Sequence, residues 1–457
     1  MSDLGTLSSL GLGSSGALSY DTIDKLRAAD EDAIIKPIDK KIQTTQTRQK
    51  ALDDLTTLLA TFKSSTSALS YDSLYSKVNV DTVGSSALIT AQDGVNSQEI
   101  KLDISNIATN DVKESKSFSK TDSTFTDGAD TLKFELASGK SFEIDVDENT
   151  TISQLAEEIN NNSNGTMSAS ILNVGGDKPY KLVIKSTDTG ADNAITVSST
   201  GGGSAADDLD LTTVGSGAQD AHFTYNGVSI TRSSNDINDL IIGVDIKLVS
   251  SGTTTADITQ DTQSIKDEIN SFIKGYNSLI DNLNQTTKYN PQTQEVGIFQ
   301  GVSQIRGLKN EINYDIFNYS FNGHTIADFG ITLNEAGHLQ LDESVLDDKL
   351  QNDPNGVKDF FMGGTTNNPE DGMFVKLNDD LGSIFMKSNS ELKLYKNYLD
   401  KKLQNLNDQK INQTKKLDIK YEIMAKRFSS YDSIISSYNS SYQSLQMQID
   451  SFTKTKA

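Results

Sequence analysis

The segment LDKKLQNLNDQKINQTKKLDIKYEIMAKRFSSYDSIISSYNSSYQSLQMQIDSF, residues 399–452, decides the fold of this chain. Its seam positions recur at spacings that alternate between four and three residues, which predicts one long helix with a heptad seam. A helix of this kind is marginal alone, so the seam predicts a partner helix or another subunit. The seam positions are Leu399, Leu403, Leu406, Lys410, Gln413, Leu417, Tyr421, Met424, Phe428, Tyr431, Ile435, Tyr438, Tyr442, Leu445, Ile449 and Phe452.

The seam divides into two parts that differ in charge. An ordinary intramolecular coiled coil explains residues 399–425 as well as an interface does. Between residues 429 and 453 the charged side chains are Asp432 and Asp450 alone, among Ser, Tyr, Asn and Gln. Aromatic and methionine side chains suit adaptable contacts, so this second part favours an intermolecular role.

The start of the chain supplies a second amphipathic helix. Residues 1–20 are rich in Gly, Ser and Leu without a period, and we expect them to be disordered alone. Helical spacing then begins, with Asp21 or Thr22 in position to cap the helix, and Pro37 is expected to interrupt or kink it. The two terminal helices are expected to pair. The candidate oligomerisation residues are Ile23, Leu26, Phe428, Tyr431, Ile435, Tyr438, Tyr442, Leu445 and Ile449.

The middle of the chain has a different period. Residues 76–260 alternate every second residue, which predicts strands. One hairpin is predicted over residues 132–146 around a Ser-Gly turn. A second is predicted over residues 223–230, because Asn226-Gly227 between alternating apolar residues is the strongest short signal for a hairpin.

Two further helices are predicted around these strands. Thr151 and Gln154 have the spacing of a capping box and open a short helix. A longer apolar stripe begins after Asp261. The chain is therefore organised as helix, β-rich insertion and helix. The stripe consists of Ile265, Ile269, Phe272, Ile273, Tyr276, Leu279 and Leu283.

Composition excludes several classes of protein. The 457 residues carry a net charge of −22, with about −15 on residues 76–260 and about +5 on residues 391–457. Nucleic acid is not an expected partner, because phosphate binding needs a basic face. Cysteine is absent, so disulfides and thiolate metal sites are excluded. We expect no membrane insertion and no cleaved signal peptide, because the sequence has neither a transmembrane-length apolar run nor a basic start.

Catalytic motifs are also missing, so we expect no enzyme, no cofactor and no metal. His222, His324 and His338 are not spaced as metal ligands, and no GxSxG sequence supports a serine triad. Residues 145–156 begin like a calcium loop but lack its glycine and glutamate. The glycines at 201–203 are not followed by Lys-Ser or Lys-Thr, so they form no P-loop. An aspartate-based hydrolase would require a pocket with paired, perturbed carboxylates.

SSLGLGSSGALSYDTIDKL at residues 8–26 and Arg-Ser-Ser-Asn at residues 232–235 resemble segments of a known family, the flagellar filament cap family, also called hook-associated protein 2. SSLGLGSSGALSYDTIDKL at residues 8–26 is similar to the opening of that family, which usually has Gly-Leu-Asp where this chain has Gly16-Ala17-Leu18. Arg232-Ser233-Ser234-Asn235 is the most specific piece. Further similar segments lie at residues 28–42, 150–197, 221–249 and 329–363, and the third of these begins the family's C-terminal region; residues 150–197 resemble an insert that flagellins share.

The resemblance implies an α+β fold in which the terminal helices pair as a coiled-coil leg and helical domain, with β-rich head domains inserted between them. It implies the following division: residues 1–42, disordered segment and leg helix; 43–75 and 261–400, helical domain; 76–115 and 218–260, first β domain; 116–217, second β domain; 401–457, C-terminal leg helix.

The resemblance also implies a function and partners. The protein would form a ring at the tip of an extracellular flagellum, with five copies expected and four or six as the alternatives, and would promote flagellin assembly through the candidate residues named above. Export would use the flagellar type III channel. The implied partners are the protein itself, flagellin, the hook-filament junction protein and an export chaperone. The alternative is a surface adhesin whose β domains bind host glycans or mucin.

Overall fold

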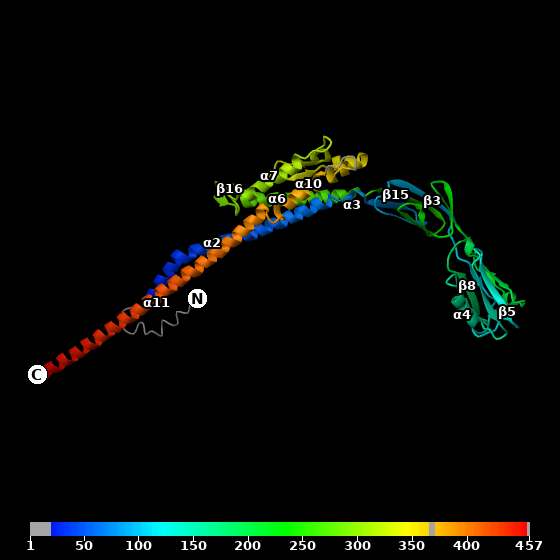
Figure 1. The fold of residues 1–457 in the computed structure, drawn as a ribbon, viewed down its shortest axis with the longest axis horizontal. Coiled ribbons are helices and arrows are strands. Elements are labelled where there is room, and N and C mark those ends of the chain that lie inside the picture. Colours follow the sequence, from blue (N-terminus) through cyan, green and yellow to red (C-terminus); the bar gives the residue numbers. More distant parts are fainter. Residues whose placement is uncertain (1–19, 365–370, 455–457) are drawn as a thin grey trace. The chain divides into compact units, whose positions relative to one another are not determined.

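The computed structural model describes residues 20–364 and 371–454. The predicted disorder of residues 1–20 lies outside these residues, except at Tyr20. The chain divides into two compact units: Met1–Tyr71 with Lys266–Ala457, and Asp72–Ile265. The first is mainly helical and the second mainly strands (Figure 1). The predicted α+β class, with terminal helices around β-rich domains, is confirmed.

Two long helices run side by side in the helical unit. They are α2 (Tyr20–Ala68) and α11 (Glu391–Lys454), drawn blue and orange to red in Figure 1. The single long C-terminal helix predicted from the heptad seam is therefore confirmed, because α11 continues through residue 452 without a break. The predicted pairing of the terminal helices is also confirmed.

Helix α2 differs from its prediction at two places. It continues through Pro37, so the predicted interruption is wrong. A proline removes one helical hydrogen bond, but Ile35 and Ile38 on either side are buried, and their packing holds the helix together. The helix begins at Tyr20, so Asp21 and Thr22 lie inside it rather than at its cap.

The other helices of this unit surround a dense aromatic core. Phe272 stacks on Phe62 with ring centroids 5.4 Å apart and meets Phe374 edge-on at 4.9 Å. The predicted stripe after Asp261 is buried along its whole length, as expected. Among the described residues, no helix has both the length and the hydropathy to span a membrane. These helices are α6 (Thr262–Thr287), α7 (Ser303–Phe317), α8 (Glu343–Asn352), α9 (Pro354–Met362) and α10 (Met373–Phe385).

Short strands complete the helical unit as two small hairpins. One pairs β18 (Ile331–Leu333) with β19 (Leu339–Leu341). Between α6 and α7, β16 (Tyr289–Asn290) pairs with β17 (Glu295–Val296). A short 3-10 helix, Ile326–Phe329, precedes β18.

The β unit has two separate apolar cores. The first lies between a five-stranded sheet in the order β1-β15-β3-β11-β12 and a three-stranded sheet in the order β13-β14-β2. Buried side chains such as Leu102 and Phe223 fill this core. The strands are β1 (Val78–Val83), β2 (Ala87–Ala91), β3 (Gln98–Asn106), β11 (Ala221–Tyr225), β12 (Val228–Arg232), β13 (Asp236–Ile241), β14 (Val244–Leu248) and β15 (Gly252–Gln260); helix α3 (Asp72–Tyr75) precedes them.

The second core is built from the segment between β3 and β11. A four-stranded sheet in the order β10-β4-β8-β7 and a three-stranded sheet in the order β6-β5-β9 share it with two helices. Phe134 and Leu155 are fully buried there. The elements are β4 (Val112–Glu114), β5 (Asp130–Leu136), β6 (Ser141–Val146), α4 (Ile152–Asn162), β7 (Met167–Asn173), β8 (Tyr180–Ser186), β9 (Ile195–Ser199), α5 (Ala205–Leu209) and β10 (Thr212–Thr213), with a 3-10 turn at Ala191–Asn193.

Local sequence signals in the β unit are confirmed. Strands β5 and β6 form the first hairpin, and β11 and β12 form the second. Asn226 and Gly227 both adopt positive φ, at 47° and 85°, as a two-residue turn of this kind requires. Thr151 and Gln154 make the reciprocal hydrogen bonds of a capping box at the start of α4.

The glycines at 201–203 have a structural use that the sequence did not reveal. The Asp130 carboxylate accepts hydrogen bonds from the backbone N–H groups of Thr131, Gly201, Gly203 and Ala205, at 2.8 to 3.2 Å. A Cβ atom at Gly201 would lie 2.5 Å from the Thr131 nitrogen, so this close approach requires glycine. The loop therefore encloses a carboxylate of its own chain.

The Arg-Ser-Ser-Asn segment also gains a structural explanation. The Asn235 side chain donates to the Ala108 carbonyl and accepts from the Ala108 N–H, each at 2.8 Å. The Ser233 carbonyl accepts a hydrogen bond from the Thr189 hydroxyl at 2.6 Å. The segment between β12 and β13 is therefore hydrogen-bonded to the chain near Ala108 and near Thr189.

Candidate assembly surface

The first turns of α2 meet the middle of α11 in one apolar cluster. Ile23 and Ile35 of α2 pack against Leu417, Tyr421 and Ala425 of α11, and all five side chains are buried. Each large side chain buried in this way stabilises the pair by about 1.5–3 kcal/mol. This part of the seam is satisfied within the chain, so the intramolecular coiled coil is the correct alternative here. Met424 and Phe428 border the cluster.

Charged contacts fix how the two helices are aligned. Arg27 donates to Asp418 at 2.5 Å, and Asp30 accepts from Lys420 at 2.5 Å and from the Tyr421 hydroxyl at 2.8 Å. The hydrogen bond from Lys420, and then that from Tyr421, lowers the pKa of Asp30. Burial, and then the bond to Asp30, raises the pKa of Tyr421 to about 12. Sliding one helix along the other would break all three contacts.

A second set of polar contacts continues this alignment along the helices. Lys410 pairs with Asp39 at 2.7 Å, and Lys396 pairs with Asp53 at 2.8 Å. These pairs are solvated, so each contributes no more than about 1 kcal/mol. Their value lies in specificity, because sliding one helix along the other would break both pairs.

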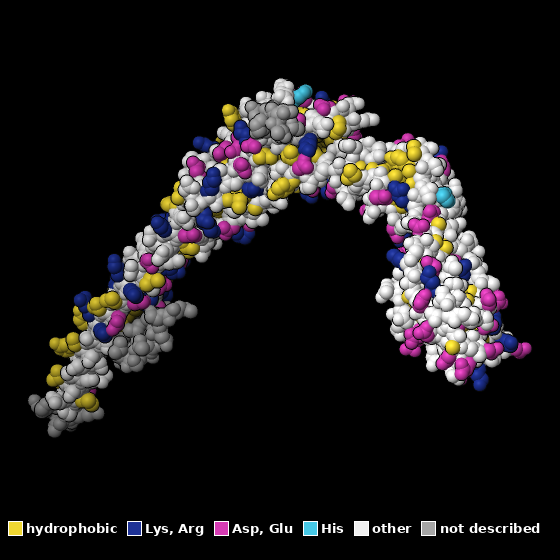
Figure 2. Space-filling model, turned by 45° about the vertical axis from the view of Figure 1, so that its right-hand side comes forward, with side chains coloured by type: hydrophobic (Ala, Val, Ile, Leu, Met, Phe, Trp, Pro, Cys, Tyr) yellow, Lys and Arg dark blue, Asp and Glu magenta, His cyan; other side chains and the backbone are white. Residues whose placement is uncertain are grey.

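Beyond Phe428 the seam of α11 emerges into solvent. Tyr438 is 74% exposed, Tyr442 67% and Leu445 58%. Figure 2 shows hydrophobic side chains gathered along this end of the molecule. We call this set the α11 terminal surface; it comprises Tyr431, Ile434, Ile435, Tyr438, Tyr442, Leu445, Met447 and Ile449, all at least 36% exposed.

The predicted contact residues therefore fall into two groups. Ile23 lies in the α2–α11 cluster, Phe428 lies half-buried at its edge, and Leu26 on α2 is 46% exposed. The remaining six belong to the α11 terminal surface: Tyr431, Ile435, Tyr438, Tyr442, Leu445 and Ile449. The structure thus separates one internal packing residue from a row of side chains that are at least 36% exposed.

Sequence reasoning missed the polar side chains that align the helices. Asp30, Arg27 and Asp418 resemble any solvated charges on a helix, and their partners lie at the other end of the chain. The sequence carries no local signal for these pairs, because they depend on the register of α2 against α11.

Both ends of this chain match models of one protein family. The model described as "Flagellar hook-associated protein 2 N-terminus" matches residues 15–111, and "Flagellar hook-associated protein 2 C-terminus" matches residues 218–440. The chain belongs to the flagellar hook-associated protein 2 family. The model "Flagellin hook IN motif" matches residues 131–188, inside the second β core. The family resemblance seen in the sequence is confirmed.

Curated members of the hook-associated protein 2 family align with most of the chain. The protein from Campylobacter jejuni is 33% identical over 79% of this chain and 65% of its own length. That from Helicobacter pylori strain J99 is 25% identical over 98% of this chain and 99% of its own length. That from Escherichia coli K12 is 28% identical over 99% and 100%.

A solved structure shares the fold. The D1-D2-D3 domains of the flagellar cap protein FliD from Escherichia coli align with 76% of this chain and 99% of that chain, with a TM-score of 0.52 and 26% identity. The match to the C-terminal family model ends at residue 440, inside the α11 terminal surface, between Tyr438 and Tyr442.

Proposed function

We propose that this chain is the structural cap at the distal end of the flagellar filament. Copies form a ring there, promote the folding and polymerisation of flagellin, and prevent the loss of monomers. Membership of the hook-associated protein 2 family supports this role at both ends of the sequence. The observation that carries it in the structure is the α11 terminal surface, a row of exposed Tyr, Leu and Ile side chains on a protruding helix end.

The α11 terminal surface serves assembly rather than folding. An exposed apolar row of this length is unusual on a soluble helix and is typical of a contact site. Between residues 429 and 453 Asp432 and Asp450 are the only charges, so docking desolvates few ionised groups. The assembly role includes Leu26, which is exposed on α2, and Phe428 and Ile23, which belong to the α2–α11 cluster and its edge.

The family resemblance supports a more detailed set of partners. The ring contains five copies, and its contacts are with flagellin and with the hook-filament junction protein. An export chaperone holds the chain before secretion. The protein leaves the cell through the flagellar type III channel without a cleaved signal peptide and acts outside the cell at the flagellum tip.

The domain division also remains our proposal. Residues 76–115 and 218–260 form the first β domain, and residues 116–217 form the second. The two separate apolar cores of the β unit support this division. Residues 43–75 and 261–400 form the helical domain, and residues 1–42 and 401–457 supply the leg.

We assign no catalytic role to the chain. The hydrolase alternative required paired carboxylates in a pocket, and Glu311 and Glu391 do line one cavity. Because the family is structural, we attribute binding rather than hydrolysis to this pair. Nothing in the described part of the chain favours the adhesin alternative, so we do not propose it.

A gene deletion tests the cap role directly. Electron micrographs of the deletion strain should show short or absent filaments, and the culture medium should contain unpolymerised flagellin. The unaltered gene supplied on a plasmid should restore both. Filaments of normal length, with no flagellin in the medium, would refute the proposal.

A further inference from the structure

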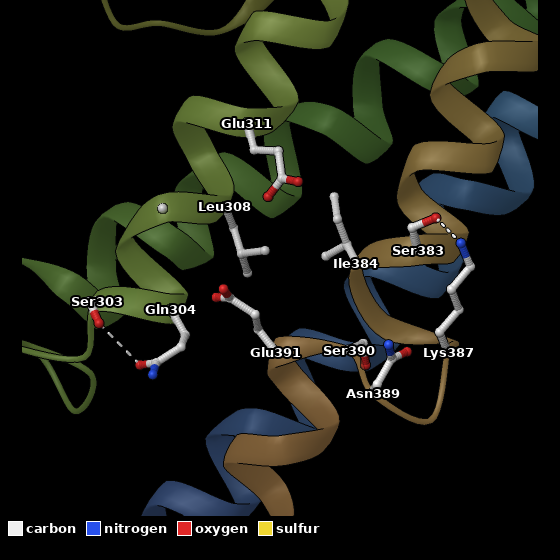
Figure 3. A pocket seen from close by; sticks show the side chains of 11 residues that line it. Ser303, Gln304, Leu308, Glu311, Ser383, Ile384, Lys387, Asn389, Ser390 and Glu391 are labelled. Atoms are coloured by element: carbon white, nitrogen blue, oxygen red, sulfur yellow. Dashed lines mark hydrogen bonds between the residues drawn. The ribbon is translucent and has the colours of Figure 1, made fainter.

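The helical unit contains a cavity that the cap role does not explain. It has a volume of about 650 Å³ and lies between α7 and the turn that joins α10 to α11. In Figure 3, the carboxylates of Glu311 and Glu391 project into this space, and Leu308 and Ile384 form apolar walls beside them. The cavity therefore combines two exposed carboxylates with two largely buried apolar side chains in a lining that is otherwise mostly polar.

The two carboxylates have no ion-pair partner among the described residues. Lys387 is the basic side chain in the lining, but its ammonium group donates to the Ser383 hydroxyl at 2.8 Å (Figure 3). Burial, and then the negative charges of Glu391 and Asp380, raises the pKa of Glu311. The cavity is thus short of positive charge.

A buried hydroxyl marks the neighbouring part of the same groove. A second cavity of about 530 Å³ shares Glu391, Ser303 and Gln304 with the first and is also lined by Tyr395 and Arg48. Tyr395 is only 9% exposed, and its hydroxyl oxygen has no hydrogen-bond partner in the described part of the chain. A buried hydroxyl without a partner costs about 1–3 kcal/mol, so a ligand oxygen that accepts from Tyr395 would be stabilised in this groove.

The Tyr395 ring lies against two other aromatic rings. It packs edge-on against Phe299 at 6.2 Å and stacks on Tyr398 at 6.1 Å. The nearby Arg48 guanidinium donates to the Ile298 carbonyl at 3.2 Å. Two donors, Tyr395 and Arg48, therefore face this end of the groove, which suits an accepting carbonyl oxygen.

We propose that this groove binds an arginine side chain presented by a segment of another polypeptide. The guanidinium lies between Glu311 and Glu391, and its methylene stem packs on Leu308 and Ile384. A backbone carbonyl of the same segment accepts from Tyr395. Arginine fits better than lysine, because a planar guanidinium with five N–H donors serves two carboxylates at once.

A titration with a small defined probe tests the site. Ligand-observed NMR on the full chain at low salt should show N-acetyl-arginine amide binding in the millimolar range, as expected for a small ligand. N-acetyl-citrulline amide has the same shape without the charge and should bind at least about tenfold more weakly. Equal binding of the two probes would overturn the proposal.

Matched variants locate the binding. Glu311→Gln and Glu391→Gln should each weaken arginine-amide binding by about tenfold, because each removes a charge-assisted hydrogen bond. Tyr395→Phe should weaken it several-fold, whereas Lys387→Met should strengthen it. Glu335→Gln, on an exposed turn of the same unit, should change nothing. Unchanged affinity in both carboxylate variants would refute the site. The cap role does not depend on this result, because the groove and the α11 terminal surface share no residue.

Discussion

The Tyr421 hydroxyl donates to the Asp30 carboxylate across 2.8 Å, joining residues that are 391 positions apart in the sequence. The same carboxylate oxygen accepts from Lys420 at 2.5 Å. This contact aligns the two ends of the chain. It thereby determines which part of the α11 seam is covered by α2 and which part is exposed.

Removing that hydroxyl should loosen the helix pair. Tyr421→Phe keeps the buried ring but loses the bond to Asp30, at a cost of about 1 kcal/mol. Hydrogen exchange in the purified chain should become faster in the first turns of α2 and near residue 421. Tyr431→Phe, on the exposed surface, is the matched control and should leave exchange unchanged. Equal exchange in all three proteins would contradict the assigned alignment.

Charges on the α11 terminal surface should block assembly without harming the fold. Tyr442→Asp with Leu445→Asp places two carboxylates where docking removes water, which is unfavourable. We expect a weakened ring, flagellin in the medium and an unchanged melt of the β unit. Normal filaments would show that the surface has another use, and a collapsed melt would show that it belongs to the main fold. Asn439→Asp with Ser440→Asp is a control for charge alone.

The β unit should fold as an isolated fragment. Asp72–Ile265 forms one compact unit with its own two apolar cores. A purified fragment of these residues should melt cooperatively in circular dichroism, with native-like β signal. A fragment without a cooperative transition would show that the cores need the helices.

The carboxylate enclosed by the glycine loop should give the β unit an acid-sensitive stability. The Ser199 hydroxyl and the backbone N–H groups of Ala205, Gly203 and Thr131 lower the pKa of Asp130 to about 2. Because this is below the unfolded value of 3.8, the stabilisation is full above about pH 4 and is lost as the pH falls towards 2. Asp130→Asn should lower the melting temperature by several degrees at pH 7 and by little at pH 2. Asp127→Asn is the nearby control.

The Asp315 carboxylate in the helical unit lies near other acidic groups and should make that unit less stable as the pH rises. Burial, and then the charges of Asp380 and Glu311, raises the pKa of Asp315 to about 6. The pKa of Asp315 in the folded state exceeds the unfolded value of 3.8. The contribution of this group to stability is therefore full below about pH 4 and is lost as the pH rises through 6. Asp315→Asn should stabilise the unit at pH 7.5, by about 1 kcal/mol after allowance for solvent screening. An Asp315→Asn melting temperature unchanged at pH 7.5 would contradict this account. So would an increase at pH 4 as large as that at pH 7.5, or an equal increase in the control variant Asp379→Asn.

Periodicity in the sequence predicted the elements well. The heptad seam specified α11, and the Asn226-Gly227 pair specified the second hairpin, because each signal involves residues that are close in sequence. Pro37 does not interrupt α2, since the packing of Ile35 and Ile38 outweighs the missing hydrogen bond. Local propensity is a weak guide where tertiary packing is strong.

The sequence by itself determined the order of helices and strands, the family and the exposed character of the α11 end. Only the tertiary structure decided that Asp30 meets Tyr421, that glycines at 201 and 203 enclose Asp130, and that Glu311 faces Glu391 across a cavity. Each of these pairs joins segments that are distant in sequence; even Gly201 lies 71 positions from Asp130. Their proximity depends on helix register and chain crossing, which the spacing of side chains along one segment does not encode.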